Sequence, residues 1–197
     1  MTIELPEIDP ARSALLAMDY QAAILASFPG GPQPLLTRVA DAIAIARRQK
    51  MHVAYVRVAF DDADLQAMPL RNKMASRVKS AGLNLHNDAP GTAICGEVAP
   101  QPGDIIVRKT RVGAFSTTDL DRQLRERAIT TLLLAGVSTS GVVLSTVRDA
   151  ADRDYQIVVL SDACADPQPE VHAFLIEHVF PRQADVMTTA DLRQRWP

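Results

Sequence analysis

Short apolar runs alternate with longer amphipathic segments along the chain. The runs are apolar at consecutive positions, a pattern typical of strands that are buried on both faces. We expect strands at 14–18, 52–60, 105–109, 131–136, 156–163 and, as a last short one, 184–188. The segments between them show the spacing of amphipathic helices. We expect helices at 35–50, 117–128 and 169–180, and a further one after the run that ends at Gly136.

This alternation of strand and helix predicts an α/β fold: a doubly wound parallel sheet of about six strands with helices on both faces, a Rossmann-like arrangement of three layers. The length and the lack of a linker or repeat predict one domain over residues 1–197. The stretch 61–103, rich in Pro, Gly, Asn and Asp, carries no clear element. A loop of that length in a compact domain is usually a lid or a pocket wall, and we expect one here.

Composition and charge narrow the class of protein. Apolar residues make up 47% of the chain and charged residues 22%, both ordinary for a globular domain. The net charge of −2 gives no electrostatic reason to expect a nucleic acid or an anionic membrane as partner. No apolar run is long enough to span a bilayer, and the acidic, proline-broken start is unlike a signal peptide. We therefore expect a cytoplasmic protein.

Cysteine and histidine give no sign of a metal centre. The chain has two cysteines, Cys95 and Cys164, and four scattered histidines that never pair at a spacing of three or four. We expect no metal and no cofactor. Both cysteines are expected to act as small packing residues.

Chemically useful residues follow three of the predicted strands. Asp19 follows the first strand, Lys109 ends the third, and the fourth runs into a small-residue elbow over 136–142 before a helix begins. The carboxyl ends of parallel strands meet at one edge of a sheet, where ligands bind near the point of strand reversal. We therefore expect a carboxylate, an ammonium group and helix-terminal amides to converge on one pocket.

The segments that carry these residues are similar to motifs of the isochorismatase-like (cysteine hydrolase) family. They read LLAMDYQ at 15–21, KTRVGAF at 109–115, AGVSTSGVVLSTVRDAADRDY at 135–155 and VVLSDACAD at 158–166. The resemblance covers nearly the whole chain. It implies a six-stranded parallel sheet and, for many members, hydrolysis of amides or imides by an Asp–Lys–Cys triad. On this sequence the Asp is Asp19, the Lys is Lys109, and the Cys position holds Val142.

Val142 has no lone pair, so the ordinary cysteine mechanism is not available to this chain. Isochorismatases also lack the cysteine, having Gly there, and split a vinyl ether by protonation from the Asp. The resemblance thus implies a hydrolase that acts on a small, anionic molecule through acid–base chemistry at Asp19, with Lys109 nearby and water as the attacking group. Isochorismate itself is a poor fit, because Val fills the room that Gly leaves. Burial would raise the pKa of Asp19, whereas Lys109 would lower it.

Two other functions stay open. The first is a catalytically inactive member of the family that binds a small molecule with the same residues. The second is a hydrolase with a surrogate Ser or Thr nucleophile in the elbow. Ser138, Thr139 and Ser140 fit better as caps of the elbow helix, and Ser140 is the candidate surrogate.

The remaining site predictions concern the walls of the pocket. Tyr20, Gln21 and Phe115 are candidate substrate contacts, although aromatic residues at such positions are equally typical of a core. Guanidinium groups bind carboxylates through two parallel hydrogen bonds, so basic residues are candidate substrate anchors. These are Arg57, Arg71, Lys73 and Arg111.

The resemblance also implies a cis peptide between Val137 and Ser138, which would aim the amides of Gly141 and Val142 into the pocket. It implies a homo-oligomer in which a neighbouring chain completes that pocket. A metal-binding member of the family, nicotinamidase, needs an Asp and His cluster after the second strand. Here that segment reads FDDADLQAMP without histidine, and we expect its aspartates to be solvated charges rather than metal ligands.

Overall fold

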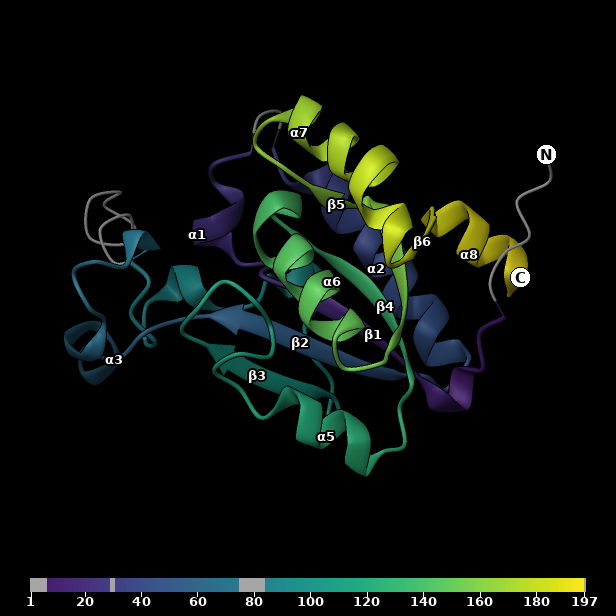
Figure 1. Ribbon diagram of the computed structural model, residues 1–197, viewed down its shortest axis with the longest axis horizontal. Helices are drawn as coiled ribbons and strands as arrows, with labels where there is room; N and C mark the ends of the chain where they lie inside the picture. Colours follow the sequence, from purple (N-terminus) through teal and green to yellow (C-terminus); the bar gives the residue numbers. More distant parts are fainter. Residues whose placement is uncertain (1–6, 29–30, 75–83, 197) are drawn as a thin grey trace.

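The computed structural model describes residues 7–28, 31–74 and 84–196 and is built on a six-stranded sheet (Figure 1). The strands are β1 Ser13–Met18, β2 His52–Val58, β3 Ile105–Lys109, β4 Thr131–Val137, β5 Gln156–Ala165 and β6 Asp185–Met187. Their order is β3-β2-β1-β4-β5-β6, and every neighbouring pair is parallel. The fold predicted from the alternation of strand and helix is confirmed.

Helices cover both faces of the sheet (Figure 1). One face packs against α5 Leu120–Glu126, α6 Leu144–Ala151 and α7 Pro169–Phe174. The other packs against α2 Gln33–Arg48 and α8 Thr189–Arg195. We call the apolar cluster under α5, α6 and α7 the first core and the one under α2 and α8 the second core.

The central strand β1 shows why the strands contain runs of consecutive apolar residues. Ala14, Leu16 and Met18 lie in the first core, while Leu15 and Ala17 lie in the second. Successive side chains of a strand point to opposite faces, so a strand covered by helices on both sides needs an apolar residue at each position. The runs of consecutive apolar residues therefore indicate a sheet that lies between two layers of helices.

Three predicted helices have different limits in the structure. The helix expected at 35–50 begins at Gln33 and ends at Arg48. The helix expected at 117–128 begins only at Leu120, because Thr118 accepts the Leu120 N–H at 3.2 Å and Asp119 stands at the N-cap. The helix expected at 169–180 is α-helical to Phe174 and continues as a π-helical turn over Leu175–Val179. Local hydrogen bonding of this kind leaves no clear mark on hydrophobic periodicity.

The stretch 61–103 contains a helix that was not predicted, α3 Asp62–Ala67. Asp61 accepts the Asp64 N–H at 2.9 Å, and the Asp64 carboxylate accepts the Asp61 N–H at 3.1 Å. Two of the aspartates in FDDADLQAMP thus cap a helix rather than stand as solvated charges, which corrects that expectation. Residues 75–83 lie outside the described residues, so the predicted lid falls partly beyond them. Two further short helices, α1 Ala22–Leu25 and α8, were also not predicted.

The strand order reverses between β1 and β4. β2 and β3 lie on one side of β1, and β4, β5 and β6 lie on the other. At this switch point Met18 is in register with Gly136. A Cβ on Gly136 would lie 3.0 Å from the Met18 Cβ and 3.1 Å from its carbonyl oxygen, so glycine permits this close approach. Asp19 and the elbow, which follow these two residues closely, therefore lie side by side.

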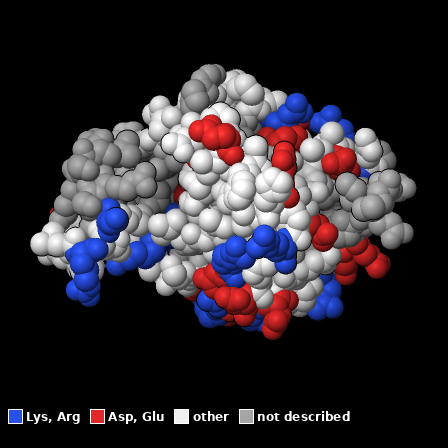
Figure 2. Space-filling model, turned by 45° about the horizontal axis from the view of Figure 1, so that its top comes forward, with Lys and Arg blue, Asp and Glu red and all other residues white. Residues whose placement is uncertain are grey.

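Charge is mixed over the surface. Figure 2 shows basic and acidic side chains interspersed in small groups over one face. Within the described parts of the chain, no helix is long and apolar enough to cross a membrane. The same residues contain no group of three His, Cys, Asp or Glu side chains that could hold a metal ion.

Candidate functional site

A buried ion pair joins the ends of β1 and β3. The Lys109 Nζ lies 2.8 Å from Asp19 Oδ2, and the two side chains are only 3% and 7% exposed. The ammonium group also donates to the carbonyl oxygens of Arg111 at 3.2 Å and Val112 at 3.0 Å. An ammonium has three donors, so all of them are engaged and the group is held in place. The predicted meeting of Asp19 with Lys109 is therefore seen.

A left-handed backbone conformation turns Asp19 toward Lys109. Its φ is 61°, an uncommon value that Asp tolerates better than most residues. Strict alternation along β1 would point residue 19 into the second core, after Leu15 and Ala17. Lys109, however, continues the row of Ile105 and Val107, which lie in the first core. The turn at Asp19 breaks the alternation and lets its carboxylate reach the Lys109 side of the sheet.

Burial dominates the electrostatics of Asp19. It raises the pKa of this carboxyl above the ordinary 3.8, and the charge and hydrogen bond of Lys109, which lower the pKa, do not cancel the effect. Oδ2 faces Lys109, whereas Oδ1 is buried and, within the described residues, has no hydrogen-bond partner. A carboxyl with a raised pKa and one unpaired oxygen is suited to hold or transfer a proton.

The elbow after β4 has the backbone that the resemblance implied. The peptide between Val137 and Ser138 is cis. A π-helical turn over Thr139–Val143 follows and leads into α6. Val142, to which the resemblance assigns the position of the family cysteine, is buried in the first core and packs among apolar side chains.

Backbone N–H groups of the elbow are engaged in hydrogen bonds that were not expected. Gly141 donates its N–H to the Ser138 carbonyl at 3.1 Å, so the expectation that this amide faces a pocket is wrong. Ser140 is exposed and donates its N–H to Asp166 Oδ2 at 2.8 Å. Ser138 makes no side-chain cap of the turn, contrary to the expected role of these hydroxyls. The Gly141 amide thus stabilises the turn itself, and the Ser140 amide binds Asp166.

Gln21 is a structural clamp rather than a substrate contact. Its amide nitrogen donates to the carbonyls of Val58 at 2.9 Å and Thr92 at 2.6 Å, and its oxygen accepts the Val58 N–H at 2.8 Å. Its own N–H donates to the Asp19 carbonyl at 2.8 Å. The side chain is fully buried, so the prediction that it contacts substrate is wrong. Gln21 instead ties the Asp19 turn to β2 and to the segment before β3.

A family model described as the isochorismatase domain matches residues 13–191. The chain belongs to the isochorismatase family. The family resemblance drawn from the four sequence segments is thereby confirmed.

Relatives cover most of this isochorismatase-family chain. The ureidoacrylate amidohydrolase RutB of Methylobacterium radiotolerans is 32% identical over 184 residues, which cover 83% of this chain and 70% of that protein. The uncharacterized isochorismatase family protein YecD of Escherichia coli O157:H7 is 32% identical over 191 residues, or 94% and 97% of the two chains. The solved structure of an isochorismatase family protein from Burkholderia thailandensis has a TM-score of 0.81 at 30% identity and covers 95% and 96%.

The two aromatic residues that were predicted as walls of the substrate pocket pack against other parts of the protein. The Tyr20 hydroxyl donates to the Ala163 carbonyl, and the side chain lies in the second core. Phe115 stacks on Tyr155 with ring centroids 6.1 Å apart, and the Arg153 guanidinium covers its ring at 5.0 Å. Both rings serve packing, so their prediction as pocket walls is wrong.

The basic residues predicted as substrate anchors lie in different surroundings. Arg57 is in register with Arg108, one residue before Lys109, and so points to the opposite face of the sheet. Arg111 donates to the neighbouring Thr110 carbonyl at 2.6 Å. The remaining two residues, Arg71 and Lys73, are exposed. The prediction that Arg57 shares a pocket with Lys109 is therefore wrong.

A hydroxyl–imidazole pair behind the elbow was missed by sequence reasoning. Thr139 Oγ1 and His172 Nδ1 are 2.8 Å apart, and this contact joins the elbow to α7. Burial lowers the pKa of His172, and the nearby Asp166 raises it. Thr139 is fully buried, so its hydroxyl fastens the elbow and does not face solvent. No fixed spacing links residues 139 and 172, so only the fold could reveal the pair.

Neither cysteine has the environment of a nucleophile. Burial raises the pKa of Cys164 to about 12, and its Sγ lies 3.8 Å from the Leu134 carbonyl. Burial also raises the pKa of Cys95, with a smaller contribution from Glu97. Reactive thiols have lowered pKa values, so both residues fit the predicted packing role.

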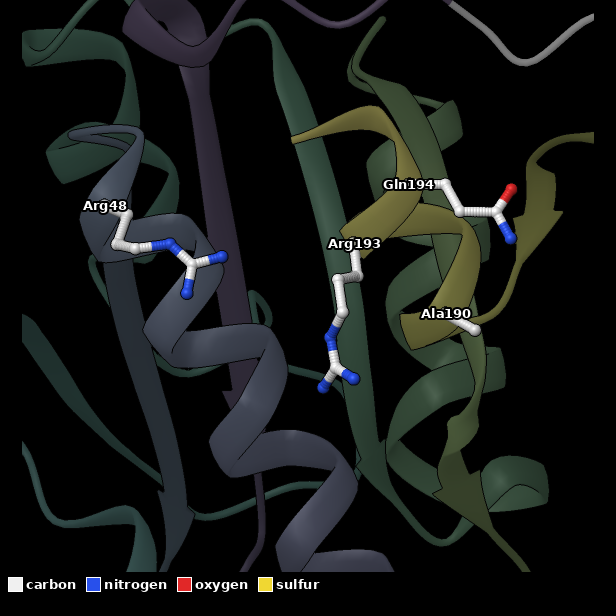
Figure 3. A pocket seen from close by; sticks show the side chains of 4 residues that line it. All are labelled: Arg48, Ala190, Arg193 and Gln194. Carbon is white, nitrogen blue, oxygen red and sulfur yellow. The ribbon is translucent and has the colours of Figure 1, made fainter. Parts of the chain in front are cut away.

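A depression of about 840 Å³ lies between α2 and α8 (Figure 3). It is lined by Arg48, Ala190, Arg193 and Gln194, and the side chains of Arg48 and Arg193 extend into the space between the two helices. Arg193 pairs with Asp41 at 2.8 Å. This depression belongs to the layer over the second core and contains none of the predicted site residues.

Proposed function

We propose that this member of the isochorismatase family is a hydrolase that acts on a small, anionic molecule. In this proposal Asp19 supplies acid–base chemistry, and no cysteine nucleophile takes part. The observation that carries it is the buried Asp19–Lys109 pair, in which one carboxyl oxygen is unpaired and the pKa is raised. The similarity to a relative that is an amidohydrolase, RutB, supports hydrolysis as the reaction class.

The raised pKa is what makes an aspartate useful as an acid. An ordinary Asp is protonated in only about one molecule in a thousand at pH 7. Burial enlarges that fraction, because it disfavours the charged form. In the proposed cycle the proton passes from Asp19 to the leaving atom of the substrate and water supplies the attacking oxygen. The proton released by that water returns to Asp19, so the carboxyl is restored.

Lys109 has a supporting role in this proposal. As the proton leaves Asp19, a buried carboxylate forms, and the ammonium group 2.8 Å away stabilises it. All three Lys109 donors are engaged, one with Asp19 and two with the Arg111 and Val112 carbonyls. Lys109 is therefore placed to stabilise charge on Asp19 and not to form bonds with the substrate.

One observation favours the second candidate, a binder of small molecules without turnover. Hydrolysis of an acyl group gains much of its rate from free donors aimed at the developing oxyanion. In this chain the Gly141 amide is engaged by the Ser138 carbonyl. This arrangement favours substrates whose cleavage needs proton transfer rather than an oxyanion hole, or recognition alone.

The test is turnover of a panel by three proteins: the wild type, Asp19→Asn and, as a matched control, Asp64→Asn. The panel holds isochorismate, followed by pyruvate release, and small carboxylic acids that carry an amide or ureido group. We expect Asp19→Asn to lose about 1,000-fold in kcat/KM with ligand binding retained, because it cannot transfer the proton. Asp64→Asn, which lies in a different ion pair, should stay within about twofold of the wild type.

Three other outcomes overturn the proposal. Equal turnover by the wild type and Asp19→Asn would remove Asp19 from the chemistry. Absence of turnover over the whole panel, together with a ligand-induced rise in Tm, would establish the binder. A covalent mass increment on Ser140 under single-turnover conditions would establish the surrogate nucleophile.

A further inference from the structure

The face of β2 and β3 that points away from the first core carries two arginines side by side. Arg57 and Arg108 are direct register partners on these neighbouring strands. Ile106, which shares this face with them, is apolar and yet 52% exposed. Like charges directly opposite one another destabilise a sheet unless something balances them.

Among the described residues, only one of the two arginines forms a direct ion pair. Arg108 pairs with Asp64 and lies 3.6 Å from Asp61. Arg57 donates to the Asn87 side-chain oxygen and, at 3.3 Å, to the Thr92 carbonyl, both of which are neutral. In the described ranges no carboxylate lies within ion-pair distance of Arg57. Among the described residues this half-buried cation thus has no direct ion pair, and Asp88 supplies only a more distant negative charge.

Arg57 lines a depression of about 430 Å³ with apolar walls. The other residues that line it are Asn87, Asp88, Ala89, Pro90, Thr92, Ala93, Ile94, Pro100 and Ile106. A guanidinium has five N–H donors, and the contacts with Asn87 and Thr92 use two nitrogens. The remaining donors and the exposed side of Ile106 are available to the same ligand.

We propose that this depression is a second binding site, separate from Asp19, for a small monocarboxylic acid with an apolar body. The carboxylate pairs with Arg57 through parallel hydrogen bonds, the geometry that a guanidinium favours. The apolar body packs against Ile94 and Ile106. The carboxylate of Asp88 also lines the depression, so a ligand with two negative charges is disfavoured relative to one with a single charge.

The site is distinct from the proposed catalytic one because it lies on the other face of the sheet. Lys109 and Asp19 meet on the side of the first core, whereas Arg57 faces away from it. One carbonyl nevertheless connects them: Thr92 O accepts from both Arg57 and Gln21. A ligand on Arg57 therefore acts on a contact of the clamp that holds the Asp19 turn.

Benzoate serves as the probe, with neutral benzamide as its uncharged match. We expect calorimetry to detect benzoate binding to the wild type and much weaker binding of benzamide. Arg57→Gln should lower the affinity for benzoate by about tenfold or more, because a charged hydrogen-bonded contact is lost. Arg57→Lys keeps the charge without the planar fork and should give an intermediate loss. Asp19→Asn should bind benzoate like the wild type, which places the probe outside the Asp19 site.

Ile106→Ser provides a variant that does not threaten folding, because the side chain is already half exposed. This variant should lower the affinity for benzoate several-fold, because apolar contact is lost, and its Tm should be unchanged. The proposal is overturned if the wild type does not bind benzoate, or if Arg57→Gln and Ile106→Ser bind it as tightly as the wild type. It is also overturned if Asp19→Asn is the variant that abolishes binding.

Discussion

Two adjacent residues at the end of β3 form ion pairs with very different surroundings. Lys109 pairs with Asp19, and these side chains are 3% and 7% exposed. Arg108 pairs with Asp64 on the opposite face, where the side chains are 33% and 24% exposed. Burial raises the pKa of Asp19 in spite of Lys109, whereas hydrogen bonds, above all the one from Arg108, lower the pKa of Asp64.

The difference shows that a cation beside an aspartate does not by itself decide what the aspartate can do. When both groups are buried, the cost of desolvating the carboxylate outweighs the attraction, and the carboxyl keeps its proton to higher pH. When they are partly exposed, attraction and hydrogen bonding prevail, and the carboxylate is a structural partner. Asp64 accordingly caps α3 while Asp19 keeps an unpaired oxygen.

Removal of the buried cation should have the largest effect on stability. Lys109→Met leaves the Asp19 carboxyl without its partner in a buried place, and we expect a loss of about 3–5 kcal/mol in the free energy of unfolding. Urea denaturation measures it. The double variant Asp19→Asn/Lys109→Met should recover much of the loss, since no buried charge remains. A loss below about 1 kcal/mol in the single variant would show that the pair is not as buried as described.

Removal of the Gln21 clamp should have the next largest effect. Gln21→Ala removes the side-chain partner of the Val58 N–H and of the Val58 carbonyl, and it leaves the Thr92 carbonyl with Arg57 alone. Because unsatisfied buried groups are costly, we expect a loss of about 3 kcal/mol in urea denaturation. Gln123→Ala on the exposed surface of α5 is the control and should change stability by less than about 0.5 kcal/mol. Equal effects of the two variants would contradict the role of the clamp.

The two aspartates should also give opposite pH dependence. The folded pKa of Asp19 is raised, so its contribution to stability is present below pH 3.8 and is lost as the pH rises through the folded pKa. The folded pKa of Asp64 is lowered, so its contribution is present above pH 3.8 and is lost as the pH falls. For each variant, the difference in unfolding free energy between the wild type and the variant is plotted against pH. The plots for Asp19→Asn and Asp64→Asn should therefore slope in opposite directions. Parallel slopes would contradict the comparison.

Removal of the exposed cation should have the smallest effect. Arg108→Met breaks a pair that solvent already screens, and we expect a loss of about 1 kcal/mol or less in urea denaturation. The comparison with Lys109→Met is the relevant control, since the two residues are adjacent in β3. If both variants lost the same free energy, burial would not be what distinguishes the two ion pairs.

Much of the fold could be predicted because it depends on the period of apolar residues. After its first residue, Ser13, β1 is apolar at every position because both cores need it, and β4 shows the same pattern after Thr131. The short helices α3 and α8 were missed because capping boxes at Asp61 and Thr188 define them, and such local hydrogen bonds leave little hydrophobic periodicity.

The candidate site was predicted in part for a similar reason. Asp19 and Lys109 could be placed together because strand ends meet at one edge of a parallel sheet. The directions of the Tyr20 and Arg57 side chains could not be placed in this way. The left-handed turn at Asp19 decides which face Tyr20 occupies, and the strand alternation decides which face Arg57 occupies. The use of the Gly141 amide within the elbow likewise depends on the folded turn.

The most direct test of the account is a carbon-detected NMR titration of the aspartate carboxyl groups in the folded wild type, which needs no substrate. Asp19→Asn and Asp64→Asn assign the two resonances. The account predicts that Asp19 titrates above 3.8 and Asp64 below it in the same sample. An Asp19 carboxyl that titrates at or below 3.8 would contradict the claim that burial makes this residue the acid of the site.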